Sequence, residues 1–150
     1  MEISENDLEI FITSAERFFT VTTGDPVSCG EARIHFSLPP LLDYTGWIVV
    51  SGIARGVVCI TASRDTLGGM LGSLGEHPED DELMADLVGE LAGTLAMNAR
   101  EHFGEHLNVS TPQVFSTGNR PEPPGNVAFA IPLAWRGHEL TLMIAIELTE

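Results

Sequence analysis

The sequence predicts a single domain of the α+β class over residues 1–150, in which an antiparallel β-sheet carries two long helices and one short helix. Three observations predict this class. Helical and strand-like patterns follow one another as helix, strands, two helices and strands, without regular strand–helix alternation. Two pairs of β-branched runs are joined by short segments that contain Arg-Gly, as in hairpins. One long segment keeps a single apolar face from end to end.

The first long helix is predicted over Asn6–Phe19, with Asn6 or Asp7 as its N-terminal cap. Its apolar residues recur at helical spacing: Leu8, Phe11, Ile12, Ala15, Phe18 and Phe19. Residues Thr20–Thr23 are expected to begin an extended stretch that breaks at Gly24-Asp25-Pro26.

Strands are predicted next. Ala32–Leu38 alternates in polarity and stops at Pro39-Pro40, because proline cannot extend a hydrogen-bonded ladder. Gly46–Ile53 and Gly56–Ala62 are β-branched runs, and we expect them to form a hairpin that turns at Arg55-Gly56.

Two helices follow. Arg64–Leu74 is predicted as the short helix, capped by Ser63. The second long helix is predicted over Glu79–Phe103, opened by Pro78 and stopped by Gly104. Its first turn is expected to hold four acids, which the helix dipole favours: Glu79, Asp80, Asp81 and Glu82. Its apolar face consists of Leu83, Met84, Leu87, Val88, Leu91, Ala92, Leu95, Ala96, Ala99 and Phe103.

The C-terminal third is predicted to return to strands. Asn108–Gly118 starts as a strand and ends in a turn, and Arg120–Asn126 is a proline-rich loop. Val127–Trp135 and Glu139–Leu148 form a second hairpin through Arg136-Gly137-His138.

The net charge of −15, from 22 acids and seven bases that are all arginine, limits the classes of partner. A surface this negative repels phosphate backbones and anionic lipids, so neither nucleic acid nor membrane is expected as a partner. A partner with a basic rim would be attracted, although the charge would equally serve solubility alone. No apolar run reaches a membrane-spanning length, and the N-terminus lacks the pattern of a signal peptide. Cys29 and Cys59 are expected as free thiols, and the expected location is the cytoplasm.

A polar ridge is predicted on the second long helix, opposite its apolar face. It consists of Asp86, Gly89, Glu90, Gly93, Met97 and Arg100, spaced by three or four residues. Glycine in a helix interior costs about 1 kcal/mol relative to alanine. Two glycines on one face therefore indicate that something comes close to the backbone there. That neighbour is either a visiting protein or a helix or strand of the same chain.

The segment Asp86–Arg100, DLVGELAGTLAMNAR, resembles the signature helix of the CheX branch of the CheC/CheX/FliY family of chemotaxis phosphatases. Gly52–Leu71 resembles the family's hairpin and short helix, and Val109–Asn119 resembles the strand and turn after the signature helix. Ala128–Leu148 is similar to its closing hairpin. The resemblance implies a CheC-like fold, a homodimer, and action on the phosphorylated response regulator CheY.

The resemblance also implies a mechanism based on a Glu-x-x-Asn motif. The receiver domain of the regulator supplies the aspartyl phosphate and the divalent metal ion, so no cofactor of the chain's own is expected. The motif asparagine orients a water molecule in line with phosphorus, and the glutamate pairs with a receiver lysine. Glu90 matches the glutamate, but Gly93 stands where the family has its asparagine. Losing such a positioning group commonly slows hydrolysis by a few orders of magnitude.

Two functions remain open on this basis. The chain docks a phosphorylated CheY-like receiver and dephosphorylates it, with another group placing the water, or it binds the receiver without hydrolysis. Candidate substitutes for the asparagine are Asn98, Thr94, Gln113 and Asn119. The candidate receiver-binding residues are Asp86, Gly89, Glu90, Thr94 and Met97. A self-associating structural domain is a third hypothesis.

Other chemistry has little support in the sequence. His102 and His106 are spaced as in a helical metal pair, but Gly104 lies between them, so we expect no metal site. No serine has a GxSxG setting and no Walker loop is present.

Overall fold

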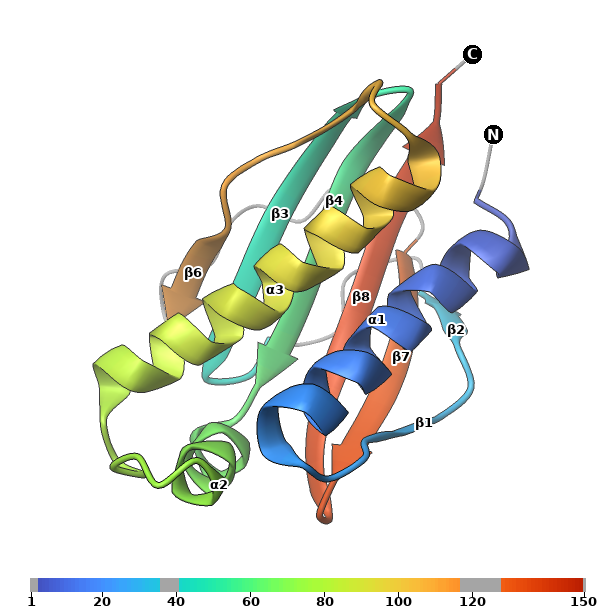
Figure 1. Cartoon of the computed structure of the whole chain (residues 1–150). Coiled ribbons are helices and arrows are strands. Elements are labelled where there is room, and N and C mark those ends of the chain that lie inside the picture. The colour runs from blue at the N-terminus through green and yellow to red at the C-terminus, as the bar shows by residue number, and fades with distance from the viewer. Residues whose placement is uncertain (1–2, 36–40, 117–127, 150) are drawn as a thin grey trace.

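The computed structural model describes residues 3–35, 41–116 and 128–149 (Figure 1). Within these ranges the chain forms three helices and eight strands, which confirms the α+β class. The helices are α1 (Glu5–Thr23), α2 (Arg64–Ser73) and α3 (Asp81–Phe103). The strands are β1 (Ser28–Cys29), β2 (Arg33–His35), β3 (Tyr44–Gly52), β4 (Ala54–Ala62), β5 (Leu107–Val109), β6 (Gln113–Ser116), β7 (Ala128–Trp135) and β8 (His138–Leu148).

All strands belong to one sheet, in the order β1-β7-β8-β4-β3-β5, and every pair is antiparallel. Two short strands lie outside this order: β2 pairs with β7, as β1 does, and β6 pairs with β3, as β5 does. The short strands β1 and β2 therefore form one edge of the sheet, and β5 and β6 form the other.

Helices α1 and α3 lie side by side across one face of the sheet, and α2 lies near one end of it (Figure 1). The main hydrophobic core fills the space between these helices and the sheet. Among its fully buried side chains are Phe11, Phe19, Ile48, Leu95 and Trp135. A smaller apolar cluster around Trp47, Cys59 and Met143 is separate from this core.

Helix α1 is longer than predicted at both ends. Ser4, not Asn6 or Asp7, caps its start and forms a capping box with Asp7. The expectation that Thr20–Thr23 is extended is wrong, because the helix continues to Thr23 and Gly24 ends it with a φ of 80°. The Thr23 hydroxyl donates to the Phe19 carbonyl at 2.6 Å and accepts from the Trp135 indole at 3.1 Å. The core thus stabilises a helical turn that β-branched residues disfavour locally.

The first hairpin forms as predicted, but its turn lies elsewhere. The chain turns at Gly52-Ile53: Gly52, the last residue of β3, has a φ of 93°, and the Ile53 amide donates to the His106 carbonyl at 3.2 Å. Arg55 and Gly56, the predicted turn, instead lie within β4 and pair with Glu147 and Ile146 of β8. The second hairpin turns at Arg136-Gly137 as predicted, and both residues have positive φ.

The other predicted elements lie close to their predicted positions. Helix α2 is capped by Ser63 as expected. The predicted strand Ala32–Leu38 is seen as β2, and its end lies outside the described residues, as does the Arg120–Asn126 loop. The predicted strand after α3 forms as the two short strands β5 and β6.

Helix α3 starts at Asp81, two residues later than predicted, because the Asp80 side chain caps it by accepting from the Leu83 amide. Two contacts anchor its first turn. The Tyr44 hydroxyl donates to Asp81 Oδ1 at 2.5 Å, and Arg64 forms an ion pair with the same carboxylate. Gly104 follows the last helical residue, as expected. These anchors fix the position of α3 above β3 and β4.

Candidate functional site: the outer face of helix α3

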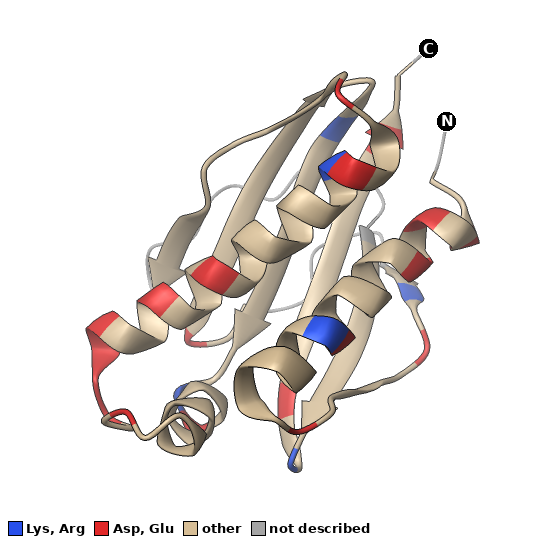
Figure 2. Ribbon diagram, in the orientation of Figure 1, with Lys and Arg blue, Asp and Glu red and all other residues tan. Residues whose placement is uncertain are grey.

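The outer face of α3 presents acidic and apolar side chains to solvent. Asp86, Glu90 and Met97 are exposed, and Met97 keeps 59% of its surface. The buried residues of the helix lie on its opposite side and pack on the sheet. The acids gather in the N-terminal half of α3 (Figure 2), which makes this half of the face negative. The predicted ridge is therefore accessible around Glu90.

Gly89 and Gly93 face the chain's own β5–β6 segment. A Cβ atom added at Gly93 would lie 3.2 Å from Pro112 Cγ, and one at Gly89 would lie 3.2 Å from Val114 Cγ2. Both separations are tighter than ordinary van der Waals contact. The neighbour that requires small residues here is therefore a segment of the same chain, the end of the β5–β6 bend and the start of β6, and not a visiting protein.

Pro112 reaches Gly93 because the chain bends between β5 and β6. Ser110 closes β5 by donating its amide to the Val49 carbonyl, and its hydroxyl accepts from the Val49 amide, each at 2.9 Å. The ladder resumes on β3 only at Gln113. Proline suits this gap because it has no amide hydrogen to donate. Sequence reasoning missed this contact, although a proline between two β-like runs was a signal of such a bend.

None of the proposed substitutes for the asparagine that lie in the described residues stands free over Gly93. The Thr94 hydroxyl donates to the Glu90 carbonyl at 2.9 Å. The Asn98 amide donates to Ser14 Oγ of α1 at 2.5 Å. Gln113 is paired with Trp47, so it shares that residue's face of the sheet, whereas Val114 turns toward α3. Asn119 lies outside the described residues.

Other reactive groups do not form a second centre. His102 is turned toward Asp7 of α1, and His106 lies past the end of α3 in an exposed turn. No three His, Cys, Asp or Glu side chains of the described segments lie close enough together to hold a metal ion. Burial raises the pKa of the Cys59 thiol to about 12. Burial, helped by Glu16 and Glu9, raises the pKa of Cys29 to about 11. Neither thiol is an activated nucleophile.

The pair of Asp7 and His102 ties the start of α1 to the end of α3. His102 Nε2 lies 2.8 Å from Asp7 Oδ1. Burial raises the pKa of the Asp7 carboxyl, but hydrogen bonds from the Ser4 amide and from His102 outweigh it and hold the pKa below 3.8. The pKa of Asp7 is lower in the folded chain than in the unfolded chain. The carboxylate therefore stabilises the fold above pH 3.8, and this stabilisation is lost as the pH falls through the lowered pKa.

We therefore expect Asp7→Asn to destabilise the chain near neutral pH and to flatten the loss of stability on acidification. Thermal unfolding of both proteins between neutral pH and about pH 3 measures this, because an amide does not titrate. Glu31→Gln, at an exposed carboxylate in the β1–β2 connection, is the matched control and should keep the wild-type profile. Parallel profiles for wild type and Asp7→Asn would show that the pair contributes nothing.

Residues 44–141 match the family model described as "Chemotaxis phosphatase CheX". No curated protein sequence matches the chain. No helix in the described part of the chain is long and apolar enough to cross a membrane.

Several solved structures share the fold. A CheC-like superfamily protein from Shewanella sp. PV-4 superposes with a TM-score of 0.83 at 21% identity, over 97% of this chain and 99% of that one. The chemotaxis protein CheX from Vibrio vulnificus gives a TM-score of 0.80 at 20% identity, over 95% and 99%. The CheX chain of a CheX–CheY–BeF3–Mg2+ complex from Borrelia burgdorferi gives 0.71 at 17% identity, over 93% and 97%.

Proposed function

The chain belongs to the CheX family, and on this premise we propose that it binds a phosphorylated CheY-like receiver domain through the outer face of α3, centred on Glu90. One observation carries the proposal: the Glu90 side chain is exposed on the outer face of α3, beside the strip at Gly89 and Gly93 that the β5–β6 segment covers. The Borrelia burgdorferi relative was solved in complex with CheY, BeF3 and Mg2+, which supports a receiver as the partner.

Glu90 would act by pairing with a cation of the receiver. In a chain with a net charge of −15, a basic patch on the partner would be attracted over several ångströms before contact. Exposed Met97, two turns further along α3, would supply apolar contact area beside this charge. Asp86, Gly89 and Thr94 are the other residues that we place at this interface.

We infer that hydrolysis by this chain is slow. The side chain that would orient water is missing at Gly93, and the Pro112 ring stands beside the vacated position. Thr94 and Asn98, two candidate substitutes for the asparagine, are held by hydrogen bonds to Glu90 and Ser14. The chain would therefore act chiefly as a receiver-binding module, and the divalent metal ion would belong to the receiver.

A decay assay separates the enzyme from the binding module. Phosphorylated receivers from the same genome are mixed with the chain and Mg2+, and loss of the phosphoryl group is followed. The proposal predicts binding with less than about tenfold acceleration. Acceleration of about a hundredfold or more would instead favour the phosphatase, with an unrecognised group placing the water.

Glu90→Ala is expected to weaken receiver binding about tenfold, because a buried charge of the receiver would lose its partner. Calorimetric titration of a receiver loaded with BeF3− and Mg2+ measures the dissociation constant. The matched control is Glu82→Ala, which removes an exposed glutamate two turns earlier on the same helix. Equal affinities for wild type and Glu90→Ala would remove Glu90 from the interface.

We also propose a cytoplasmic location, because receiver domains of response regulators act there, and a homodimer, on the strength of the family alone. Sedimentation analysis of the purified chain would test that assembly.

A further inference from the structure

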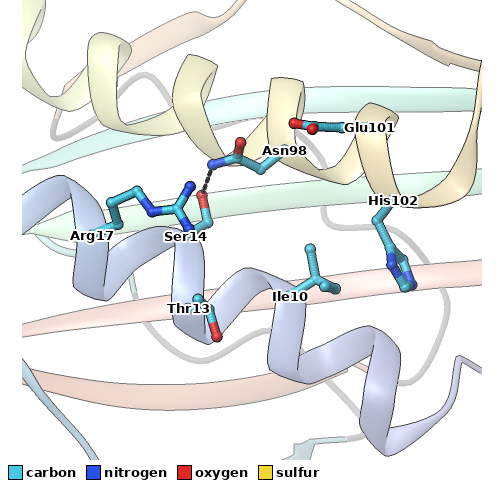
Figure 3. A pocket seen from close by; sticks show the side chains of 7 residues that line it. All are labelled: Ile10, Thr13, Ser14, Arg17, Asn98, Glu101 and His102. Atoms are coloured by element: carbon cyan, nitrogen blue, oxygen red, sulfur yellow. Dashed lines mark hydrogen bonds between the residues drawn. The ribbon is translucent and has the colours of Figure 1, made fainter.

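A polar groove of about 260 Å3 runs between α1 and α3, beside the face proposed to bind the receiver (Figure 3). Ser14 and Asn98 join the two helices across it through their 2.5 Å hydrogen bond. Thr13 and Arg17 line it from α1, and Glu101 lines it from α3.

The two helices run antiparallel along this groove, as two hydrogen bonds between them show. Asp7 of α1 bonds to His102 of α3, and Ser14, two turns further along α1, bonds to Asn98, one turn earlier on α3. Arg17 follows Ser14 by one turn, so it lies toward the half of α3 that holds Glu90. Glu101, which lines the groove, follows Glu90 by about three turns and therefore lies on the same side of α3, so the groove borders the Glu90 face.

Arg17 is an available cation on this surface. Its side chain is exposed and extends into the groove beside Ser14 and Asn98 (Figure 3). Three other arginines have ion-pair partners: Arg55 with Glu147, Arg64 with Asp81 and Arg136 with Asp25. Within the described residues, Arg17 has none, and neither do Arg33 and Arg100, although the chain carries 22 acids. An unpaired guanidinium in such an acidic protein is suited to a carboxylate from outside the chain.

Apolar surface continues in the same direction. Val21 follows Arg17 at a spacing of four on α1 and is 78% exposed, the highest value among the large exposed hydrophobic side chains. Met97 of α3 is exposed as well, so each of the two helices carries an exposed apolar side chain. Apolar contacts bordered by charged side chains are typical of a protein interface.

We propose that the receiver-docking surface crosses the groove onto α1, where Arg17 pairs with a carboxylate of the receiver and Val21 packs against it. The proposal rests on receiver binding as the function of the chain. The receiver would then be held by two ion pairs of opposite polarity: a receiver cation would contact Glu90 and a receiver carboxylate would contact Arg17. Because a reversed receiver would place like charges together, this arrangement favours one docking orientation.

Arg17→Ala tests the proposal by calorimetric titration against the receiver loaded with BeF3− and Mg2+. We expect a roughly three- to tenfold weaker affinity, and a larger loss for Arg17→Glu, which adds repulsion. The control is Arg33→Ala, which removes the same charge from an exposed arginine of β2 at the sheet edge and should stay within about twofold of wild type. Because Arg17 makes no ion pair within the described residues, Arg17→Ala should have the same thermal unfolding midpoint as the wild type.

Each other outcome overturns the proposal. If Arg17→Ala and Arg33→Ala have indistinguishable affinities while Glu90→Ala still weakens binding, the receiver docks on α3 alone and the proposed function stands. If Glu90→Ala and Arg17→Ala both bind like the wild type, receiver docking on this side of the molecule is itself excluded.

Discussion

Gly93→Asn is expected to accelerate hydrolysis of a receiver's aspartyl phosphate by about ten- to a hundredfold over the wild-type chain. The substitution returns an amide to the half-exposed position one turn after Glu90 on α3. An amide there both donates to and accepts from a water molecule, so it restricts the water to the in-line approach that phosphoryl transfer requires.

Pro112 opposes this gain. A Cβ atom at position 93 would lie 3.2 Å from Pro112 Cγ, so the β5–β6 bend must yield by a few tenths of an ångström. The double variant Gly93→Asn with Pro112→Ala removes the ring and should hydrolyse faster than Gly93→Asn alone. Single-turnover decay of the phosphorylated receiver, at saturating concentrations of the chain, measures the chemical step separately from binding.

Gly93→Ala is the matched control, since it adds the same Cβ atom without an amide. Gly93→Ala should hydrolyse the phosphorylated receiver at the wild-type rate. Any change in its receiver affinity reports the steric effect of a Cβ atom against Pro112. If neither asparagine variant hydrolyses faster than Gly93→Ala, position 93 does not face the phosphoryl group, and the docking geometry proposed for α3 is wrong.

Gly46→Ala is expected to lower the free energy of unfolding by about 3 kcal/mol. Gly46 lies in β3 directly beneath α3. An added Cβ atom would stand 2.7 Å from both the Val88 carbonyl oxygen and Ala92 Cβ. Neither the helix backbone nor a methyl group can rotate away, so α3 must shift outward from the sheet and lose packing. Urea unfolding at constant m-value measures the loss.

Gly72→Ala is the control for that experiment. Gly72 lies in α2, and an added Cβ atom there would meet nothing within 4 Å. Alanine in a helix should leave stability unchanged or raise it by up to about 1 kcal/mol. If Gly46→Ala unfolds at the same urea concentration as Gly72→Ala, α3 does not approach β3 as closely as the structure has it. The shift of α3 would also weaken receiver binding through the displaced Glu90.

Local patterns predicted those elements whose signal is contained in their own residues. Helix α3 is predicted almost to the residue because its apolar face recurs over its whole length and Gly104 ends it. The second hairpin is predicted because Arg136-Gly137 has the composition of a short turn between two strand-like runs. In the structure both residues have positive φ, as such a turn requires.

The first hairpin and the end of α1 were misplaced because distant contacts decide them. Both Gly52-Ile53 and Arg55-Gly56 have the composition of a turn, and pairing of Arg55 with Glu147 of β8 selects the former. Helix α1 continues through Thr23 because Trp135, far along the chain, bonds to the Thr23 hydroxyl. Neither contact is visible in a local window of sequence.

The candidate site was predicted in part. Helical spacing alone places Glu90 and Met97 on the outer face, and both are exposed. The reason for Gly89 and Gly93 was left open, because only tertiary structure shows that Val114 and Pro112 lie against them. The contribution of α1 was missed, since the bond between Ser14 and Asn98 joins residues far apart in the chain.

Mapping of the receiver-binding surface tests the central claim most directly. Amide chemical shifts of the isotope-labelled chain are recorded with and without an unlabelled receiver that carries BeF3− and Mg2+. The account predicts that the largest changes fall on the outer face of α3 from Asp86 to Asn98, with the β1–β2 edge unaffected. Changes confined to that edge, or to the sheet surface around Trp47, would contradict it.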